Sequence, residues 1–176
     1  MELNAYAPDF ELPSVTGEVV HLTRYLETHR AVVVVFMCNH CPYVKAYIER
    51  LKEIQRDYQP QGVTLIGINA NNEVKYPEDS FAKMQEYSQT WQLNFPYLRD
   101  HTQEVAQDFG ATCTPEPFLL DQTGCLRYRG AIDDNYRDPA AVTRQDLRLA
   151  IAALLNHQSV PTATNKAVGC SVKWVQ

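Results

Sequence analysis

The stretch Ala31-Val-Val-Val-Val-Phe-Met-Cys-Asn-His-Cys-Pro-Tyr43 contains the change of pattern that decides the fold. Its first half is an apolar, mostly β-branched run without polar alternation, which is typical of a central strand covered on both faces. A helical pattern follows directly, and its apolar stripe consists of Val44, Tyr47, Ile48, Leu51 and Ile54. We therefore predict a buried strand that leads straight into an amphipathic helix, with Cys38 and Cys41 at the junction.

Strand and helix patterns continue to alternate on both sides of this junction. A turn at residues 16–18 predicts a short N-terminal hairpin, and a second apolar run at residues 63–68 predicts another strand. Asp79 or Ser80 can cap the next helix, whose apolar positions are Phe81, Met84, Tyr87 and Trp91. The elements that follow are a segment at residues 95–98, a short helix at about 102–109, and a hairpin of strands 117–120 and 126–130.

This alternation predicts an α/β fold with a central mixed β-sheet flanked by helices, parallel first and antiparallel at the closing hairpin. Thr143-Arg-Gln-Asp146 resembles a capping box in front of a final amphipathic helix. The sequence has no internal repeat, so we assign one domain to residues 1–156. Residues 157–176 form a C-terminal tail, which we expect to pack on that domain through Val172 and Trp174.

The composition excludes several classes of protein. With 176 residues, of which 45% are hydrophobic and 21% charged, the chain is a globular domain and not a disordered segment. A net charge of −5 argues against a nucleic-acid partner, because phosphate binding needs clustered Lys and Arg. The longest apolar run, residues 31–38, is too short to span a membrane, and the N-terminus lacks signal-peptide features. We therefore expect a soluble, cytoplasmic protein without a membrane partner.

The two cysteines at the junction indicate thiol chemistry. Because Cys38 and Cys41 face the start of a helix, unpaired backbone N–H groups and the helix dipole favour their thiolate forms. A gap of two residues lets the sulfurs meet, so that one can release a partner bound to the other through a mixed disulfide. A metal site and two packed cysteines without chemistry are the remaining interpretations.

Several motifs, spread over nearly the whole chain, carry one common resemblance. They are Ala7-Pro-Asp-Phe-Glu-Leu12, Phe36-Met-Cys-Asn-His-Cys-Pro-Tyr43, Tyr76-Pro-Glu-Asp-Ser80, Phe95-Pro-Tyr-Leu98, Cys113-Thr-Pro-Glu116, Tyr128-Arg-Gly-Ala-Ile-Asp-Asp134 and Gly169-Cys-Ser-Val-Lys-Trp174. In these residues the chain resembles the thioredoxin-like superfamily. It is most similar to peroxiredoxin-like members of the alkyl hydroperoxide reductase/thiol-specific antioxidant type that carry a CxxC.

The resemblance implies a thioredoxin-like fold and assigns roles to five residues. Pro115 follows a cis peptide bond and lies against the CxxC, where the backbone of Thr114 can pair with a bound partner strand. Cys38 and Cys41 cycle between dithiol and disulfide. His40 precedes the second cysteine, as in strongly oxidising thiol oxidases and disulfide isomerases, so we expect its imidazolium to stabilise the thiolate and favour an oxidising potential.

The chain departs from the superfamily pattern in two respects. Peroxiredoxins have Thr or Ser three residues before the peroxidatic cysteine and Pro four residues earlier still, and neither Cys38 nor Cys41 has them. The buried acid of thioredoxin is missing, since residues 32–35 are all valine. Alignment of Phe36 with the strand end of thioredoxins puts Cys41 at the nucleophile position, whereas isolated CxxC chemistry favours Cys38. The nucleophile therefore stays open, with Cys41 favoured for peroxide attack and Cys38 for disulfide exchange.

The other cysteines have several interpretations. Cys113, two residues before the proline of its motif, could resolve a disulfide, complete a metal site with the CxxC and His40, or pack as a small apolar residue. Cys170 in the tail is a distant resolving thiol or a packed residue. Cys125 in the hairpin turn has no expected role.

We therefore predict a thiol–disulfide oxidoreductase that acts on protein or low-molecular-weight thiols and disulfides, with no cofactor and no metal. One alternative is a thiol peroxidase, in which Cys41 becomes a sulfenic acid and Cys38 condenses with it. Another is a metal-binding or redox-sensing module without turnover. We assign only loop and capping roles to residues 76–80 and 132–134. The candidate site residues are Cys38, His40, Cys41, Cys113, Thr114 and Pro115.

Overall fold

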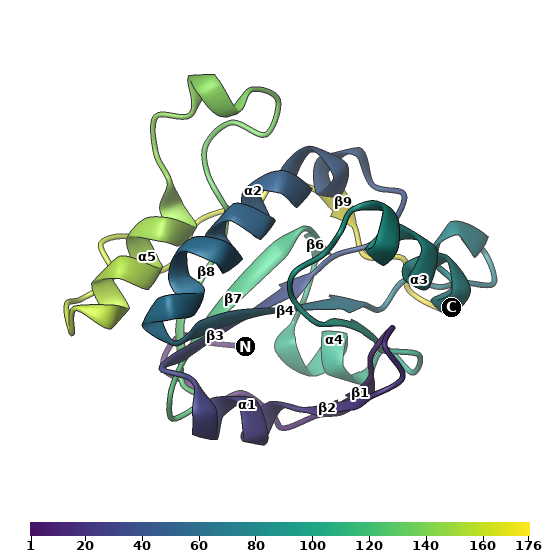
Figure 1. Ribbon diagram of the computed structural model, residues 1–176, viewed down its shortest axis with the longest axis horizontal. Helices are drawn as coiled ribbons and strands as arrows, with labels where there is room; N and C mark the ends of the chain where they lie inside the picture. The colour runs from purple at the N-terminus through teal and green to yellow at the C-terminus, as the bar shows by residue number, and fades with distance from the viewer.

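The computed structural model describes residues 1–176 and is built around a five-stranded mixed sheet (Figure 1). The strands have the order β5-β4-β3-β7-β8, in which β3, β4 and β5 are parallel and β7 and β8 are antiparallel additions. This confirms the predicted sheet and its change of direction. The strands are β3 (Ala31–Phe36), β4 (Val63–Asn69), β5 (Tyr97–Arg99), β7 (Glu116–Asp121) and β8 (Leu126–Arg129).

One face of the sheet is covered by the long helix that follows β3. Val33 and Val35 of β3 point to this face, and every residue of the stripe predicted for the helix is buried against them. Alternate residues of the strand and the apolar stripe of the helix therefore pack together in one core. The helices on this side of Figure 1 are α2 (Pro42–Tyr58), α3 (Phe81–Thr90) and α5 (Asp146–Leu155).

The opposite face carries a second core around Val32, Val34 and Phe36 of β3. Phe109 packs edge-on against Phe36 and Phe118, with ring centroids 5.5 Å apart in both pairs. The valine run is therefore buried on both faces, as its lack of polar alternation predicts. This side is formed by the predicted hairpin of β1 (Glu11–Pro13) and β2 (Val19–His21), with α1 (Leu22–Thr28) and α4 (Glu104–Phe109).

Two capping predictions have different outcomes. Ser80, not Asp79, is the N-cap of α3, and its Oγ accepts a hydrogen bond from the backbone N–H of Lys83 (3.2 Å). The capping box at Thr143 is wrong, because Thr143 donates its backbone N–H and its hydroxyl to the Asp134 carboxylate. Three short 3₁₀ helices complete the chain: η1 (Gln59–Gln61), η2 (Pro77–Asp79) and η3 (Pro139–Ala141).

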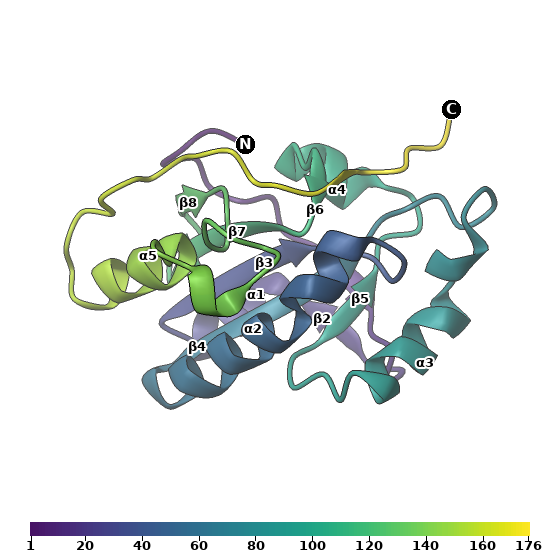
Figure 2. The same cartoon turned by 90° about the horizontal axis from the view of Figure 1, so that it is seen from above.

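The residues after α5 cross the molecule as an extended segment (Figure 2). This segment ends in β9 (Cys170–Ser171), which pairs antiparallel with β6 (Cys113–Thr114). Val172 is buried in the second core, whereas Trp174 is 38% exposed. The division of the chain at residue 156 stays a prediction. No helix has the length and apolar character required to cross a lipid bilayer.

Candidate active site

The two cysteines of the CxxC lie where β3 ends and α2 begins. β3 ends at Phe36, and the backbone N–H of Met37 still bonds to a carbonyl of β4 (2.9 Å). Cys41 is the N-cap residue of α2, and Pro42 occupies the first turn, where a missing N–H breaks no helical hydrogen bond. Because strand and helix meet in the core, Cys38 is only 1% exposed and Cys41 is 0% exposed.

Thr114 of β6 lies directly against both sulfurs. Cys38 Sγ is 3.5 Å from Thr114 Oγ1, and Cys41 Sγ is 3.5 Å from the Thr114 carbonyl oxygen. The Thr114–Pro115 peptide bond is cis, as the resemblance implies. This placement follows from the register of the sheet, because the start of β7 pairs with the end of β3. The structure thus brings four of the predicted site residues into one cluster.

The two thiols of the CxxC differ strongly in acidity. The pKa of Cys41 is lowered to about 4, chiefly by a hydrogen bond from Cys38, against the opposing effect of burial. The pKa of Cys38 is raised, first by that same hydrogen bond, then by burial and by the negative charge of Asp79. Cys41 is therefore the thiolate near neutral pH, and Cys38 is the thiol that donates to it.

His40 is directed at a buried carboxylate. Its Nδ1 lies 2.6 Å from Asp79 Oδ2, and the side chain of Asp79 is completely buried. Asp79 also accepts hydrogen bonds from the backbone N–H of Asn39 (2.8 Å) and from the side-chain amide of Asn71 (3.0 Å). This carboxylate therefore fixes both the loop between the cysteines and the imidazole next to it.

Comparisons with known proteins identify the family of this chain. The family model described as the AhpC/TSA family matches residues 3–129. The chain belongs to the AhpC/TSA family. This confirms the resemblance stated from the motifs. The thioredoxin-like fold is confirmed by similarity to the solution structure of a putative thioredoxin from Neisseria meningitidis, with a TM-score of 0.67 and 19% identity, covering 85% of this chain and 89% of that chain.

The chain is similar to curated proteins of known name. One is the "Thiol-disulfide oxidoreductase ResA" of Geobacillus thermodenitrificans, which is 28% identical over 121 residues. That match covers 69% of this chain and 64% of the relative, so the chain spans less than two thirds of its length. The "Thiol:disulfide interchange protein DsbE" of Pseudomonas aeruginosa is 30% identical over 149 residues, covering 80% of this chain and 74% of the relative.

Solved structures include two with a TM-score of 0.92 that cover 99% of this chain. One is a hypothetical protein, SMc02350, from Sinorhizobium meliloti, with 35% identity and 96% of its own chain covered. The other is an uncharacterized conserved protein from Geobacillus kaustophilus, with 39% identity and 93% of its chain covered. Peroxidoxin BcpB from Mycobacterium tuberculosis shares the fold, with a TM-score of 0.62 and 17% identity. That match covers 89% of this chain and 95% of the BcpB chain.

Asp79 is the site residue that sequence analysis does not identify in this AhpC/TSA family chain. β3 has no buried acid, as expected, but Asp79 reaches Cys38 from η2 instead. Tyr76 precedes the same segment, and its ring stacks on His40 with centroids 5.6 Å apart. The motif at residues 76–80, which contains Asp79, is the only sequence feature that points to this residue. The motif does not show that this segment folds back onto the CxxC.

The metal site predicted from the two CxxC cysteines, His40 and Cys113 differs from the group of possible ligands in the structure. The atoms that could hold an ion belong to Cys38, His40 and Asp79, which lie within 4.8 Å of one another, so Asp79 takes the place expected of Cys113. Cys113 is not among these three residues. Burial and the nearby Glu116 carboxylate raise the pKa of Cys113 to about 11.

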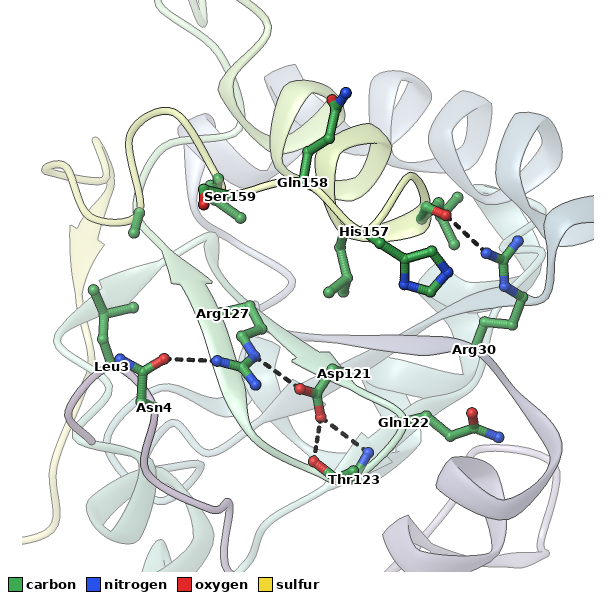
Figure 3. Close-up of a pocket in the computed structure, with 14 residues that line it drawn as sticks. Leu3, Asn4, Arg30, Asp121, Gln122, Thr123, Arg127, His157, Gln158 and Ser159 are labelled. Carbon is green, nitrogen blue, oxygen red and sulfur yellow. Dashed lines mark hydrogen bonds and ion pairs between the residues drawn. The ribbon is translucent and has the colours of Figure 1, made fainter.

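The cavity of about 700 Å³ in Figure 3 does not belong to this site. It opens beside Asp121, which pairs with Ala31 at the opposite end of β3 from the cysteines. Within it, Arg127 bonds both to Asp121 (2.7 Å) and to Asn4 (2.7 Å). The candidate site is the buried cluster around the CxxC, and this cavity lies apart from it.

Proposed function

We propose that this protein is a thiol–disulfide oxidoreductase that cycles Cys38 and Cys41 between dithiol and disulfide. One observation carries the proposal: two buried sulfurs at a helix start, with a low pKa for Cys41 and a raised pKa for Cys38. Membership of the AhpC/TSA family and relatives named as thiol–disulfide oxidoreductases support it. The partners are protein or low-molecular-weight thiols and disulfides.

In the proposed cycle Cys41 is the nucleophile, although the sequence favours Cys38 for disulfide exchange; the low pKa of Cys41 supports this choice. Its thiolate attacks one sulfur of a partner disulfide, forms a mixed disulfide, and releases the other partner sulfur as a thiolate. Cys38 then loses its proton and attacks Cys41 Sγ, so that the Cys38–Cys41 bond forms and the second partner thiolate leaves. The partner has gained two electrons and the CxxC has lost them.

His40 and Asp79 are positioned to assist the second step. Cys38 must lose a proton before it can attack, and its raised pKa opposes this loss. The imidazole and the carboxylate lie close enough to Cys38 to accept the proton directly or through a water molecule. In this role they act on the Cys38 thiol, whereas the sequence predicts that His40 stabilises the thiolate.

Mixed-disulfide trapping tests the proposal. Cys38→Ser combined with Cys170→Ser, which removes the neighbouring tail thiol, should keep the nucleophile and accumulate a mixed disulfide on Cys41, whereas Cys41→Ser should accumulate none. Both variants should lose the ability to reduce insulin, while Cys125→Ser, a change at the buried hairpin cysteine outside the site, should keep it. Retention of insulin reduction by both CxxC variants, or trapping on Cys38 alone, would overturn the assignment.

The peroxidase alternative uses the same Cys41 thiolate. Family membership supports it, but the Thr and Pro that activate peroxiredoxins are absent. Treatment of the Cys38→Ser/Cys170→Ser double variant with peroxide and dimedone distinguishes the two functions, because no neighbouring thiol is left to condense with a sulfenic acid on Cys41. A dimedone adduct on Cys41 would support peroxide attack, and its absence alongside successful disulfide trapping would leave exchange as the function.

A further inference from the structure

The tail strand β9 occupies the backbone edge next to both sulfurs. Thr114 of β6 pairs with Cys170, and Cys113 pairs with Ser171. The backbone N–H of Val172 extends this pairing by donating to a carbonyl of the preceding loop (3.1 Å). An extended peptide that adds to a strand edge in this way has the geometry of a bound peptide ligand. Here the peptide belongs to the same chain.

Contacts on both sides of Cys170 fix the position of this strand. The backbone N–H of Lys173 donates to Asn71 Oδ1 (2.9 Å), and its carbonyl accepts from Gln103 Nε2 (2.9 Å). Before the cysteine, a side chain at Gly169 would overlap the carbonyl group of Thr114, so only glycine allows this close approach. The tail is therefore seated at one register.

That register places the Cys170 sulfur on Cys41. The two Sγ atoms are 2.8 Å apart and share a hydrogen bond. Burial and this hydrogen bond raise the pKa of Cys170 to about 11, while the contact contributes to the low pKa of Cys41. Cys170 is partly exposed, whereas Cys38 and Cys41 are buried. Cys170 thus lies between the CxxC and the solvent.

We propose that residues 169–175 act as a built-in substrate strand and that Cys170 is a third redox thiol, which exchanges a disulfide with Cys41. This inference rests on the proposed cycling of the CxxC. In the oxidised protein, the Cys170 thiolate attacks Cys41 Sγ, the Cys41–Cys170 bond forms and the Cys38–Cys41 bond breaks. Cys38 leaves as a thiolate and takes up the proton that Cys170 lost, so the number of electrons in the protein does not change.

The exchange moves the disulfide to a sulfur that a reductant can reach. An external dithiol attacks Cys170 with one thiolate and releases Cys41, which is a good leaving group because its pKa is low. The second thiol of the reductant then attacks the mixed disulfide and frees Cys170. The reductant becomes a disulfide, and the protein gains two electrons while the strand stays on β6.

Disulfide mapping in glutathione redox buffers tests the proposal, with quenching by alkylation and peptide mass spectrometry. In Cys38→Ser, Cys41 attacks oxidised glutathione, and Cys170 should then displace the bound glutathione to give a Cys41–Cys170 disulfide. In Cys170→Ser, the Cys38–Cys41 disulfide should form as in the wild type. Cys125→Ser serves as the control, because this buried cysteine lies in the closing hairpin outside the site, and it should form both disulfides.

A second variant tests the seating of the strand without touching a cysteine. Gly169→Ala in the Cys38→Ser background should lower the yield of the Cys41–Cys170 disulfide at least about tenfold, because a flexible tether gives a far lower effective concentration than a docked strand. Val168→Ala, at an exposed neighbouring position, should leave the yield unchanged.

The outcomes separate this inference from the proposed function. Stable glutathionylation of Cys41 without any link to Cys170 in folded Cys38→Ser would overturn the role of Cys170. An unchanged link in the Gly169→Ala variant would overturn the role of the docked strand. Failure of Cys170→Ser to form the Cys38–Cys41 disulfide, while Cys41 and Cys170 still link in Cys38→Ser, would instead refute the cycling of the CxxC.

Discussion

Replacing Cys38 with alanine removes the hydrogen bond that contributes most to the low pKa of Cys41. A hydrogen bond to a charged group contributes about 1.5–3 kcal/mol, and one pKa unit corresponds to about 1.4 kcal/mol. The pKa of Cys41 should therefore rise from about 4 by roughly one to two units in Cys38→Ala. Cys38→Ser should give a smaller rise, because the serine hydroxyl still donates a hydrogen bond.

The ultraviolet absorbance of the thiolate in fully reduced protein measures this change. Titration of Cys41→Ser provides the baseline from the other ionising groups, and the difference curve isolates Cys41. A Cys38→Ala curve that coincides with the wild-type curve would refute the role of the hydrogen bond. A wild-type midpoint near the ordinary cysteine value would refute the assignment of Cys41 as the thiolate at neutral pH.

Three further predictions concern pH and stability. Because the folded-state pKa of Cys41 lies below its unfolded value, its thiolate stabilises the fold fully above the unfolded pKa and loses this effect as pH falls toward about 4. Urea unfolding should therefore show a gap between wild type and Cys41→Ser that shrinks from about pH 8 to about pH 5. Asp79→Asn removes a charge that raises the pKa of Cys38, so stopped-flow measurement of mixed-disulfide resolution should give a pH profile displaced to lower pH; an unchanged profile would contradict the contact. Phe109→Ala should lower the free energy of unfolding by about 3–5 kcal/mol, without preventing the Cys38–Cys41 disulfide in redox buffers.

The fold could be predicted from the sequence because its strongest signals are local. Residues 32–35 and the stripe on α2 show their structure through the spacing of apolar residues alone, and both are buried as expected. The capping box at Thr143 fails because the side chain of Asp134, nine positions earlier, takes both of its donors. A sequence pattern indicates what a residue can do locally and does not reveal a competing partner.

The site could be predicted only in part, for the same reason. The CxxC, Thr114 and Pro115 are found together, because a motif and a family resemblance identify them. Asp79 and Cys170 depend on how distant segments fold back. Cys170 lies 129 positions from Cys41, and only the register of β9 on β6 brings the two sulfurs into contact. The spacing of residues in the sequence does not predict how β9 pairs with β6.

The pairing of β9 with β6 also has a consequence for solubility. An unpaired strand edge offers free N–H and C=O groups to other chains and promotes association. β9 satisfies the edge beside Thr114 with the chain's own backbone, and Val172 covers apolar surface of the second core. A chain cut before Gly169 would expose both the edge and that apolar surface, and would associate with other copies through them. The tail therefore acts as a protective cap for the strand edge as well as a carrier of Cys170.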